Sequence, residues 1–482
     1  MSQARPPSSG PAPKFFQAIA GWLPFADAAS TELPLTQLLR LSLFQFSVGM
    51  AAVLLNGTLN RVMIVELSVP AWVVALLIAV PLLVAPFRAL IGHKSDTHKS
   101  ALGWRRVPYI WFGSLLQFGG LAIMPFALLL LSRPDTYPVS ILAAAGAFLL
   151  TGAGFHITQT AGLALATDLA PEDKRPRAVA LLYVMLLVGM MFSAFVIGGL
   201  LIEFSTTRLV QVIQGAAVLT MILNLTALWK QEARAPDRTK ANPDAPTFRE
   251  LWNAFLRDGR NARLLTAIGI GAAGFSMQDA LLEPYGGEVL GLSVGATTAL
   301  TGAWAFGALL GFMLSGRALA RGGDPLRIAG TGLVTGIAAF LLVLFAAPFG
   351  SPPMLFAGAA AIGLGLGLFS VGTLIEAMNL AKSETAGLAL GAWGAVQATC
   401  AGVGIALGGA IRDTVSWLAA DGSLSAVLAT RATGYGTVYF LEILLLIAGL
   451  AAIGPLVSHA RRTSNDLRDS AGQPFGLREF PT

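Results

Sequence analysis

The sequence predicts an all-α polytopic membrane protein with twelve transmembrane helices arranged as two six-helix bundles. Only 12% of its 482 residues are charged, about half the roughly 25% that is usual for soluble domains. The mean hydropathy is +0.69, and twelve apolar segments are long enough to cross a bilayer. All but five of the 32 Lys and Arg residues fall on one side of the predicted membrane. Because Lys and Arg accumulate on the cytoplasmic side, both termini are expected in the cytoplasm.

Residues 1–40 are expected to form a cytoplasmic N-terminal segment, which contains a short apolar stretch. Residues 14–30 are too few to span a membrane, but Phe15, Ile19 and Trp22 follow a helical spacing. This pattern predicts an amphipathic helix that lies in the membrane interface, with a loosely ordered tail as the alternative.

The first bundle is predicted over residues 41–229 and the second over residues 264–457. Between them lies a linker, residues 230–263, which is rich in proline and charge. Residues 458–482 are expected to form a cytoplasmic tail. The predicted spans cover residues 41–64, 71–91, 107–131, 139–166, 178–202, 208–229, 264–285, 293–316, 327–348, 353–378, 387–411 and 434–457.

The two halves repeat one another in parallel. Gly49 opens a segment that ends in LSVPA, residues 67–71, and Gly274 opens one that ends in LSVGA, residues 292–296, at an offset of 225 residues. Repeated bundles of this kind face each other across a central cleft, where transporters of repeated architecture bind their substrates.

The seventh predicted span carries unusual polar residues, Gln278, Asp279, Glu283 and Glu288. A carboxylate inside a membrane is costly unless it is paired or hydrated, so such residues indicate function by default. Asp279 and Glu283 are four residues apart, which places them on one face of a helix.

The same span also contains helix-breaking residues. Pro284, Gly286 and Gly287 follow directly after Glu283 and are expected to break the helix there.

The loop after the second span carries Gly92, Asp96, Gly103, Arg105 and Arg106. It resembles the signature loop of the major facilitator superfamily, with extra residues between Asp96 and Gly103. The resemblance implies the major-facilitator fold, in which these arginines are able to pair across the bundle interface. A fold alone does not specify a substrate.

Three long runs resemble one branch of that superfamily more closely. They are TLNRVMIVELSVPAW (58–72), HKSDTHKSALGWRRVPYIW (93–111) and QDALLEPYGGEVLGLSVGA (278–296). They are similar to the bacteriochlorophyll-delivery branch, which includes the PucC and LhaA proteins of purple phototrophic bacteria.

This resemblance implies an assembly role in the bacterial inner, intracytoplasmic photosynthetic membrane. The expected partners are antenna α and β polypeptides, the reaction centre–core antenna complex and pigment-synthesis enzymes, besides the lipid bilayer. Bacteriochlorophyll, bound transiently, is the one cofactor expected. The LhaA type, which serves the core antenna, is the preferred assignment.

His156 is the histidine that lies inside a predicted span, beside Gly152 and Gly154. A neutral imidazole is a suitable ligand for the magnesium of a chlorophyll, and glycines let a macrocycle approach the backbone. The alternative is a histidine that bonds to a neighbouring helix or lines a polar cavity. Gln278, Asp279 and Glu283 are the other candidates for pigment binding.

Arg61 in the first span is a candidate partner for Glu283 or Asp279. Such an ion pair would latch the two bundles together, or else would be a static pair that only satisfies buried charge. Glu442 in the last span also needs a polar neighbour, which the sequence does not identify.

Several glycines recur at helical spacing in the second bundle. Close helix packing is the main interpretation, and a docking face for antenna helices is the alternative. These residues are Gly307, Gly311, Gly363, Gly365, Gly367, Gly404 and Gly408.

No enzymatic function is expected, because no nucleophile elbow, phosphate-binding loop or metal-ligand pattern is found. A nucleic-acid partner is not expected either. Three functional hypotheses remain. The protein is an antenna assembly factor that delivers pigment, a scaffold without pigment, or a secondary transporter of a small amphipathic solute that uses Asp279 or Glu283.

Overall fold

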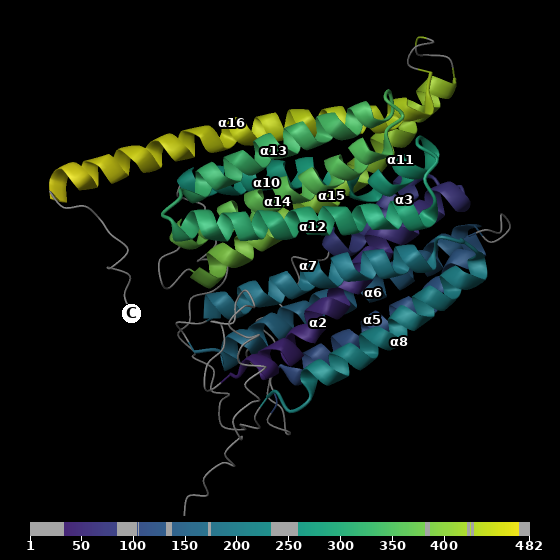
Figure 1. The fold of residues 1–482 in the computed structure, drawn as a ribbon, viewed down its shortest axis with the longest axis horizontal. Helices are drawn as coiled ribbons and strands as arrows, with labels where there is room; N and C mark the ends of the chain where they lie inside the picture. Colours follow the sequence, from purple (N-terminus) through teal and green to yellow (C-terminus); the bar gives the residue numbers. More distant parts are fainter. Residues whose placement is uncertain are drawn as a thin grey trace, which may run out of the picture.

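The computed structural model is built from helices running nearly parallel to one another (Figure 1). It describes residues 33–83, 106–131, 137–171, 175–232, 259–380, 386–421 and 429–471, together with residues 104 and 425. No β-strand occurs among these residues. The predicted interfacial helix at 14–30 and the signature-loop residues Gly92, Asp96, Gly103 and Arg105 lie outside the described residues.

The described part of the first half contains five helical elements long enough to span a membrane and one shorter apolar helix, α3. The first of them is continuous from Leu35 to Glu66 but is regular only in its first part, α2 (Leu35–Val53), followed by the π-helical segments η2 (Leu54–Leu59) and η3 (Val62–Glu66). The others are α3 (Ala71–Leu83), α5 (Val107–Leu131), α6 (Tyr137–Leu169), α7 (Arg175–Leu200) and α8 (Thr206–Leu228).

The second half repeats this pattern. Its first span consists of α10 (Gly259–Ser276), the 3₁₀ turn η7 (Met277–Ala280) and α11 (Leu282–Glu288). The remaining helices are α12 (Val294–Ala320), α13 (Pro325–Ala346), α14 (Pro352–Leu380), α15 (Ala386–Ala420) and α16 (Arg431–Ala471). α16 thus continues beyond residue 457, where the sequence predicted the end of the last span.

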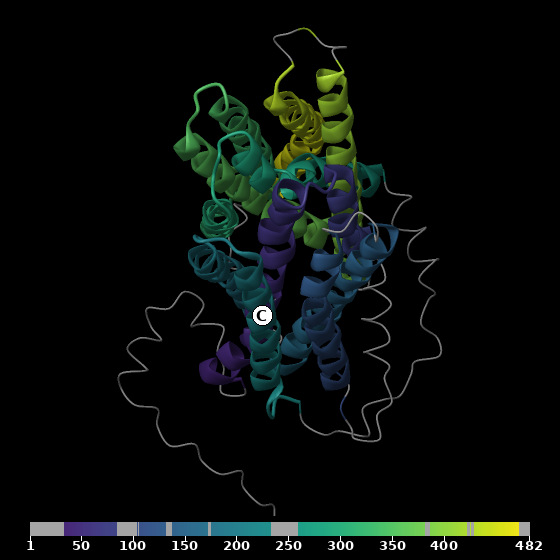
Figure 2. The ribbon, with the colours of Figure 1, turned by 90° about the vertical axis from the view of Figure 1, so that its right-hand side faces the viewer.

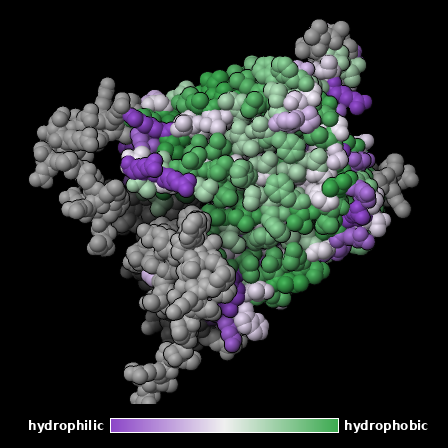
Figure 3. Space-filling model, in the orientation of Figure 1, coloured by the Kyte–Doolittle hydropathy of each residue, from purple (hydrophilic) through white to green (hydrophobic). Residues whose placement is uncertain are grey.

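Eleven of the described helices are long and apolar enough to cross a membrane, and α3 contributes a shorter apolar helix. The predicted fold class, an all-α polytopic protein, is therefore confirmed. The space-filling view agrees, because a broad hydrophobic band covers the visible face and hydrophilic residues gather at its two edges (Figure 3).

Short polar side chains set the start of several spans. Ser205 accepts a hydrogen bond from the backbone N–H of Arg208 at 3.2 Å, and Ser293 accepts one from that of Ala296 at 3.2 Å. Asp324 accepts from Leu326 at 2.8 Å, and Pro325 follows as the first helical residue. Such caps satisfy backbone N–H groups that lack a partner inside the helix.

The helices of each half pack mainly with one another, and the halves lie one above the other in Figures 1 and 2. The interface between the bundles is formed mainly where α3 packs on α15 and α7 packs on α12. We call the end of the molecule where η3 and α11 end, and where α3, α12 and α16 begin, the α11 end. There Gly198 of α7 packs on the backbone of Gly295, and Gly409 of α15 packs on Ala71.

The recurring glycines of the second bundle are buried in helix contacts. Gly363 packs on the backbone of Trp304, Gly307 on that of Ala360, and Gly408 on that of Met277. Close packing is therefore the correct interpretation of these glycines, and the alternative of a docking face made by them is wrong. By contrast, Gly119 of α5 and Gly215 of α8 have open space where a Cβ would lie.

This contrast predicts opposite effects of two glycine-to-alanine changes. Gly363→Ala forces a methyl group against the Trp304 carbonyl, so the melting temperature in detergent should fall. Gly119→Ala places its methyl in open space and should be neutral or stabilise by up to about 1 kcal/mol, because alanine favours helix more than glycine does. Equal melting temperatures for the two variants would contradict the packing.

Candidate functional site

The first span of the second bundle is interrupted at the polar residues found in the sequence. α10 ends at Ser276, and α11 begins at Leu282 after a 3₁₀ turn. We expected the break at Pro284 and the glycines, and this was wrong by one turn. Pro284 is the third residue of α11, where a missing N–H removes no hydrogen bond inside the helix.

The first span of the first bundle is irregular at the corresponding place. The repeat offset of 225 residues maps the π-helical segment η2, residues 54–59, onto residues 279–284. Segments of π-helix are rare and concentrate at functional sites. The two irregular segments contact each other across the bundle interface, and they bring the polar side chains of both halves together.

Glu283 is the centre of this contact. It is 4% exposed, and its carboxyl group accepts hydrogen bonds from Asn60 Nδ2 at 2.9 Å and from Thr301 Oγ1 at 2.8 Å. Asn60 Nδ2 also lies 3.3 Å from the carbonyl oxygen of Asp279. Asn60 comes from the first bundle and its partners from the second, so this network joins the halves.

A cavity of about 60 Å³ lies beside Glu283. Its lining includes Asn56 and Met190 from the first bundle and Gln278, Asp279, Glu283 and Trp304 from the second. This space is enough for a few water molecules but is far below the roughly 300–1,000 Å³ of pockets for drug-sized ligands. The structure therefore brings Gln278, Asp279 and Glu283 together, but around a volume that does not hold a bacteriochlorin ring.

Glu442 of α16 forms a hydrogen bond with the backbone at the break in the seventh span. It is fully buried, and its Oε1 accepts a hydrogen bond from the backbone N–H of Gln278 at 2.7 Å. The glutamate thereby replaces a backbone acceptor in the interrupted helix. Gln278 in turn donates its side-chain amide to Asp279. The polar neighbour that the sequence left unidentified is thus the break in the seventh span.

Arg61 does not pair with Glu283 or Asp279, so our expectation of that ion pair was wrong. Its guanidinium binds Glu66, five residues later on the same span, and donates to the carbonyl oxygen of Leu292 at 3.3 Å. Arg61 still reaches the second bundle, because a Cβ on Gly287 would lie 3.0 Å from its Nε. The neutral Asn60 makes the contact that we had assigned to the arginine.

A second polar cluster at the α11 end was missed from the sequence. Arg412 of α15 forms ion pairs with Glu288 and Asp413, and Tyr435 donates to Glu288 at 2.8 Å. Asp413 also accepts a hydrogen bond from the backbone N–H of Trp72 at 2.8 Å, at the start of α3 in the other bundle. The only signal in the sequence was that Glu288 and Arg412 both lie near span ends on the side with few cations.

His156 lies apart from this centre. It is 7% exposed, and its ring packs at 4.4 Å from that of Phe155. Gly152 packs on Pro81, and Gly154 packs on the backbone of Gln117. Neighbouring helices occupy the space beside both glycines. A macrocycle therefore cannot approach the backbone here in the way that we expected.

Arg106 is the signature-loop arginine that the structure describes. Its Nε binds Asp168 at 3.0 Å, and its backbone N–H donates to Glu232 at 3.0 Å. Asp168 belongs to α6 of the same bundle, so this ion pair lies within the first half.

Comparison with known proteins identifies relatives along most of the chain. The family model described as "PUCC protein" matches residues 58–461. A Rhodobacter capsulatus protein described as "Uncharacterized protein in puhA-bchM intergenic region" is 56% identical over 96% of this chain and 97% of its own. Protein PucC of Rhodovulum sulfidophilum is 58% identical over 82% and 88%. The "Bacteriochlorophyll synthase 44.5 kDa chain" of Rhodobacter capsulatus is 29% identical over 87% and 95%.

Solved structures confirm the architecture. A mutant form of the nucleoside transporter NupG superposes with a TM-score of 0.65 over 86% of this chain and 98% of its own. At 15% sequence identity this likeness concerns the fold alone.

The hydrogen bond between Asn60 and Glu283 predicts coupling between the bundles. Asn60→Ala leaves the buried carboxyl without one of its donors and should destabilise the protein by about 1–3 kcal/mol. A double-mutant cycle with Glu283→Ala should show a coupling of about 0.5–3 kcal/mol in detergent unfolding. A cycle of Arg61→Ala with Glu283→Ala is the control and should be additive. Additivity in the Asn60–Glu283 cycle together with coupling in the Arg61–Glu283 cycle would contradict this network and would instead support an Arg61–Glu283 ion pair.

The role of Glu442 as a backbone acceptor predicts different effects of two substitutions. Glu442→Gln keeps a carbonyl oxygen for the Gln278 N–H and should retain most of the stability. Glu442→Leu leaves that N–H buried without a partner, at a cost of about 1–3 kcal/mol. Thermal unfolding in detergent measures both, and a leucine variant as stable as the wild type would refute the role.

Proposed function

The chain belongs to the PUCC protein family, and we propose that it is a membrane-embedded assembly factor for light-harvesting complexes, with the core antenna as its target. It would deliver bacteriochlorophyll to antenna α and β polypeptides or hold them during pigment insertion. The family match over residues 58–461 carries this proposal, and the relative described as a bacteriochlorophyll synthase chain supports the link to pigment. This role requires no enzymatic chemistry.

The geometry favours the lipid-facing flank of the first bundle as the place of contact. The central cavity has only about 60 Å³, whereas a groove of about 280 Å³ lies between η3, α5 and α8. Pro125, Leu129, Leu209 and Ile213 line it, and Glu66 lies at the same groove. Leu129 is 43% exposed, so apolar groups in the bilayer reach the groove directly.

The same flank suits a transmembrane partner helix. Gly119 on α5 and Gly215 on α8 have open space above them, and small residues let the backbones of two membrane helices approach closely. Phe126 of α5 is 62% exposed. We therefore assign this flank to the antenna polypeptides, in an inner photosynthetic membrane with both termini of this chain in the cytoplasm.

A secondary transporter remains the second candidate. Asp279 and Glu283 line a cavity between two repeated bundles, and the fold resembles that of NupG. This candidate predicts proton-coupled uptake of a solute that Asp279→Asn abolishes. A scaffold without pigment would use the same flank but carry no bacteriochlorophyll of its own.

Extraction from photosynthetically growing cells tests the proposed function. The absorption spectrum and the co-purifying polypeptides are measured for the wild type, for Gly215→Phe on the flank, and for Gly454→Phe as control. Gly454 of α16 also has open space above it but lies in the other bundle. We expect the wild type and the control to retain antenna polypeptides with extra bacteriochlorophyll, and Gly215→Phe to lose both.

The other outcomes separate the alternatives. Antenna polypeptides with pigment only in proportion to their own sites would indicate a scaffold. Neither pigment nor polypeptides in any sample would contradict antenna assembly and favour transport. Loss in the control alone would move the docking surface to the second bundle.

A further inference from the structure

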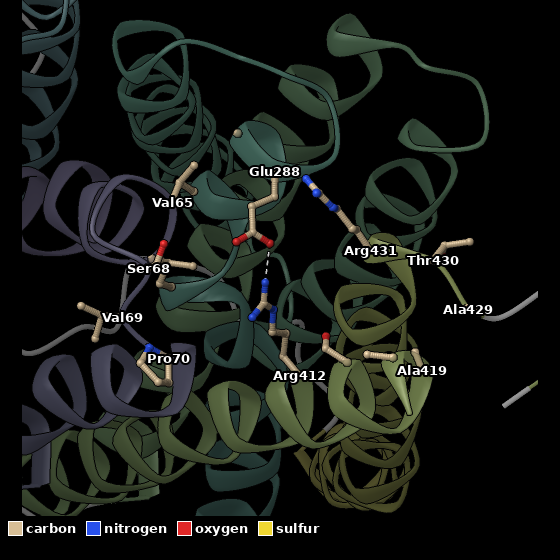
Figure 4. A pocket seen from close by; sticks show the side chains of 14 residues that line it. Val65, Ser68, Val69, Pro70, Glu288, Arg412, Ala419, Ala429, Thr430 and Arg431 are labelled. Carbon is tan, nitrogen blue, oxygen red and sulfur yellow. Dashed lines mark hydrogen bonds and ion pairs between the residues drawn. The ribbon is translucent and has the colours of Figure 1, made fainter. Parts of the chain in front are cut away.

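A pocket of about 590 Å³ opens at the α11 end and shares no lining residue with the central cavity or with the groove on the flank (Figure 4). Both bundles contribute to its wall. Val65 comes from η3, and Ser68 and Val69 come from the connection between η3 and α3. Glu288, Arg412 and Arg431 come from α11, α15 and α16. Its volume lies within the roughly 300–1,000 Å³ of small-molecule sites.

One side of the pocket is apolar and the other is charged. The apolar side includes Val65, Val69, Pro70 and the alanines 419, 420 and 429. The charged side carries Glu288, whose charge is met by Arg412, and Arg431, which reaches toward Glu288 from the opposite direction in Figure 4. Two surfaces of different polarity in one pocket match an amphipathic ligand.

The charged side has donors that the protein does not use. Arg431 is exposed and has no ion-pair or hydrogen-bond partner within the described part of the chain. The buried Nε of Arg412 and the buried Oγ of Ser416 also have no hydrogen-bond partner there. Glu288 and Asp413 both pair with Arg412, so Arg431 is the cation of the pocket wall that no described carboxylate pairs with.

The pocket lies at the level where the spans end. α11 ends at Glu288, α15 ends at Ala420, and α16 begins at Arg431. In a bilayer this level is that of the lipid headgroups, where phosphate groups are concentrated. Arginine binds phosphate through several parallel hydrogen bonds.

We propose that this pocket binds a phosphate-bearing amphiphile. Its phosphate group interacts with Arg431, and its apolar part lies along Val65, Val69 and the alanines. Because both bundles form the wall, the bound molecule stabilises the contact between them at the α11 end.

Thermal unfolding of the full chain in detergent tests this site. The protein has nine tryptophans, whose fluorescence reports unfolding. Phosphatidylglycerol, phosphatidylcholine and sodium phosphate are each titrated after removal of native lipid. A ligand that binds only the folded state raises the melting temperature in a saturable way.

We compare the wild type with Arg431→Gln, which removes the unused cation, and with Ala420→Leu, which fills the apolar side without changing charge. Arg208→Gln is the matched control, since Arg208 lies at the same end but contacts Glu203 in the first bundle. Phosphatidylglycerol should stabilise the wild type and the control. Arg431→Gln should need about tenfold more lipid, as expected when one charge-assisted contact is lost. Ala420→Leu should also need more lipid, because its side chain occupies the space of the ligand's apolar part.

The results with the three probes distinguish a lipid phosphate from a soluble one and show which outcomes refute the site. Stabilisation by sodium phosphate alone, lost in Arg431→Gln, would support the anion site and identify a soluble ligand. Equal stabilisation by phosphatidylcholine and phosphatidylglycerol, with the pocket variants behaving like the wild type, would refute the site. No saturable stabilisation by any of the three probes would refute it as well.

Discussion

The hydrogen bond from Asn60 to Glu283 is the contact on which the arrangement of the two bundles depends. A buried carboxyl group in a membrane must find a polar partner inside the protein, because the surrounding lipid offers none. Here the partner comes from the other half of the chain. Both spans lose regular helical geometry where they meet, one as π-helix and the other as a 3₁₀ turn, and Glu442 satisfies the backbone N–H of Gln278 at the 3₁₀ turn.

As a consequence, the cavity at the centre of the protein is small, and the larger recesses lie at its surface. At the α11 end, glycines bring α7 onto α12 and α15 onto α3, and Asp413 binds the backbone N–H of Trp72 in α3 across the interface. The space left at the centre suits water or protons, whereas the larger recesses lie on the flank and at the α11 end. A protein that handles large pigments and helices through its surface fits this distribution better than one that moves them through its middle.

The sequence predicted the spans and the repeat well, because the length and hydropathy of a span are properties of local sequence. It also predicted that Gln278, Asp279 and Glu283 lie together, since four residues make one helical turn. The sequence did not predict which polar side chains pair with one another. Arg61 was assigned to a carboxylate in the other bundle, although Glu66 on the same span was within reach. Arg412 and Glu288 are separated by 124 residues, and no local pattern shows that α15 and α11 place them side by side.

The claim that Asn60 and Glu283 hold the bundles in this arrangement is tested most directly by distances between the bundles. Spin labels at Ile202 and Phe349, which are both exposed and lie at the α11 end, report this distance by pulsed electron resonance once Cys400, a free cysteine, is replaced by alanine. We expect one narrow distance distribution for the otherwise unchanged chain and a broadened or shifted one for Asn60→Ala. An identical distribution in both would contradict the account.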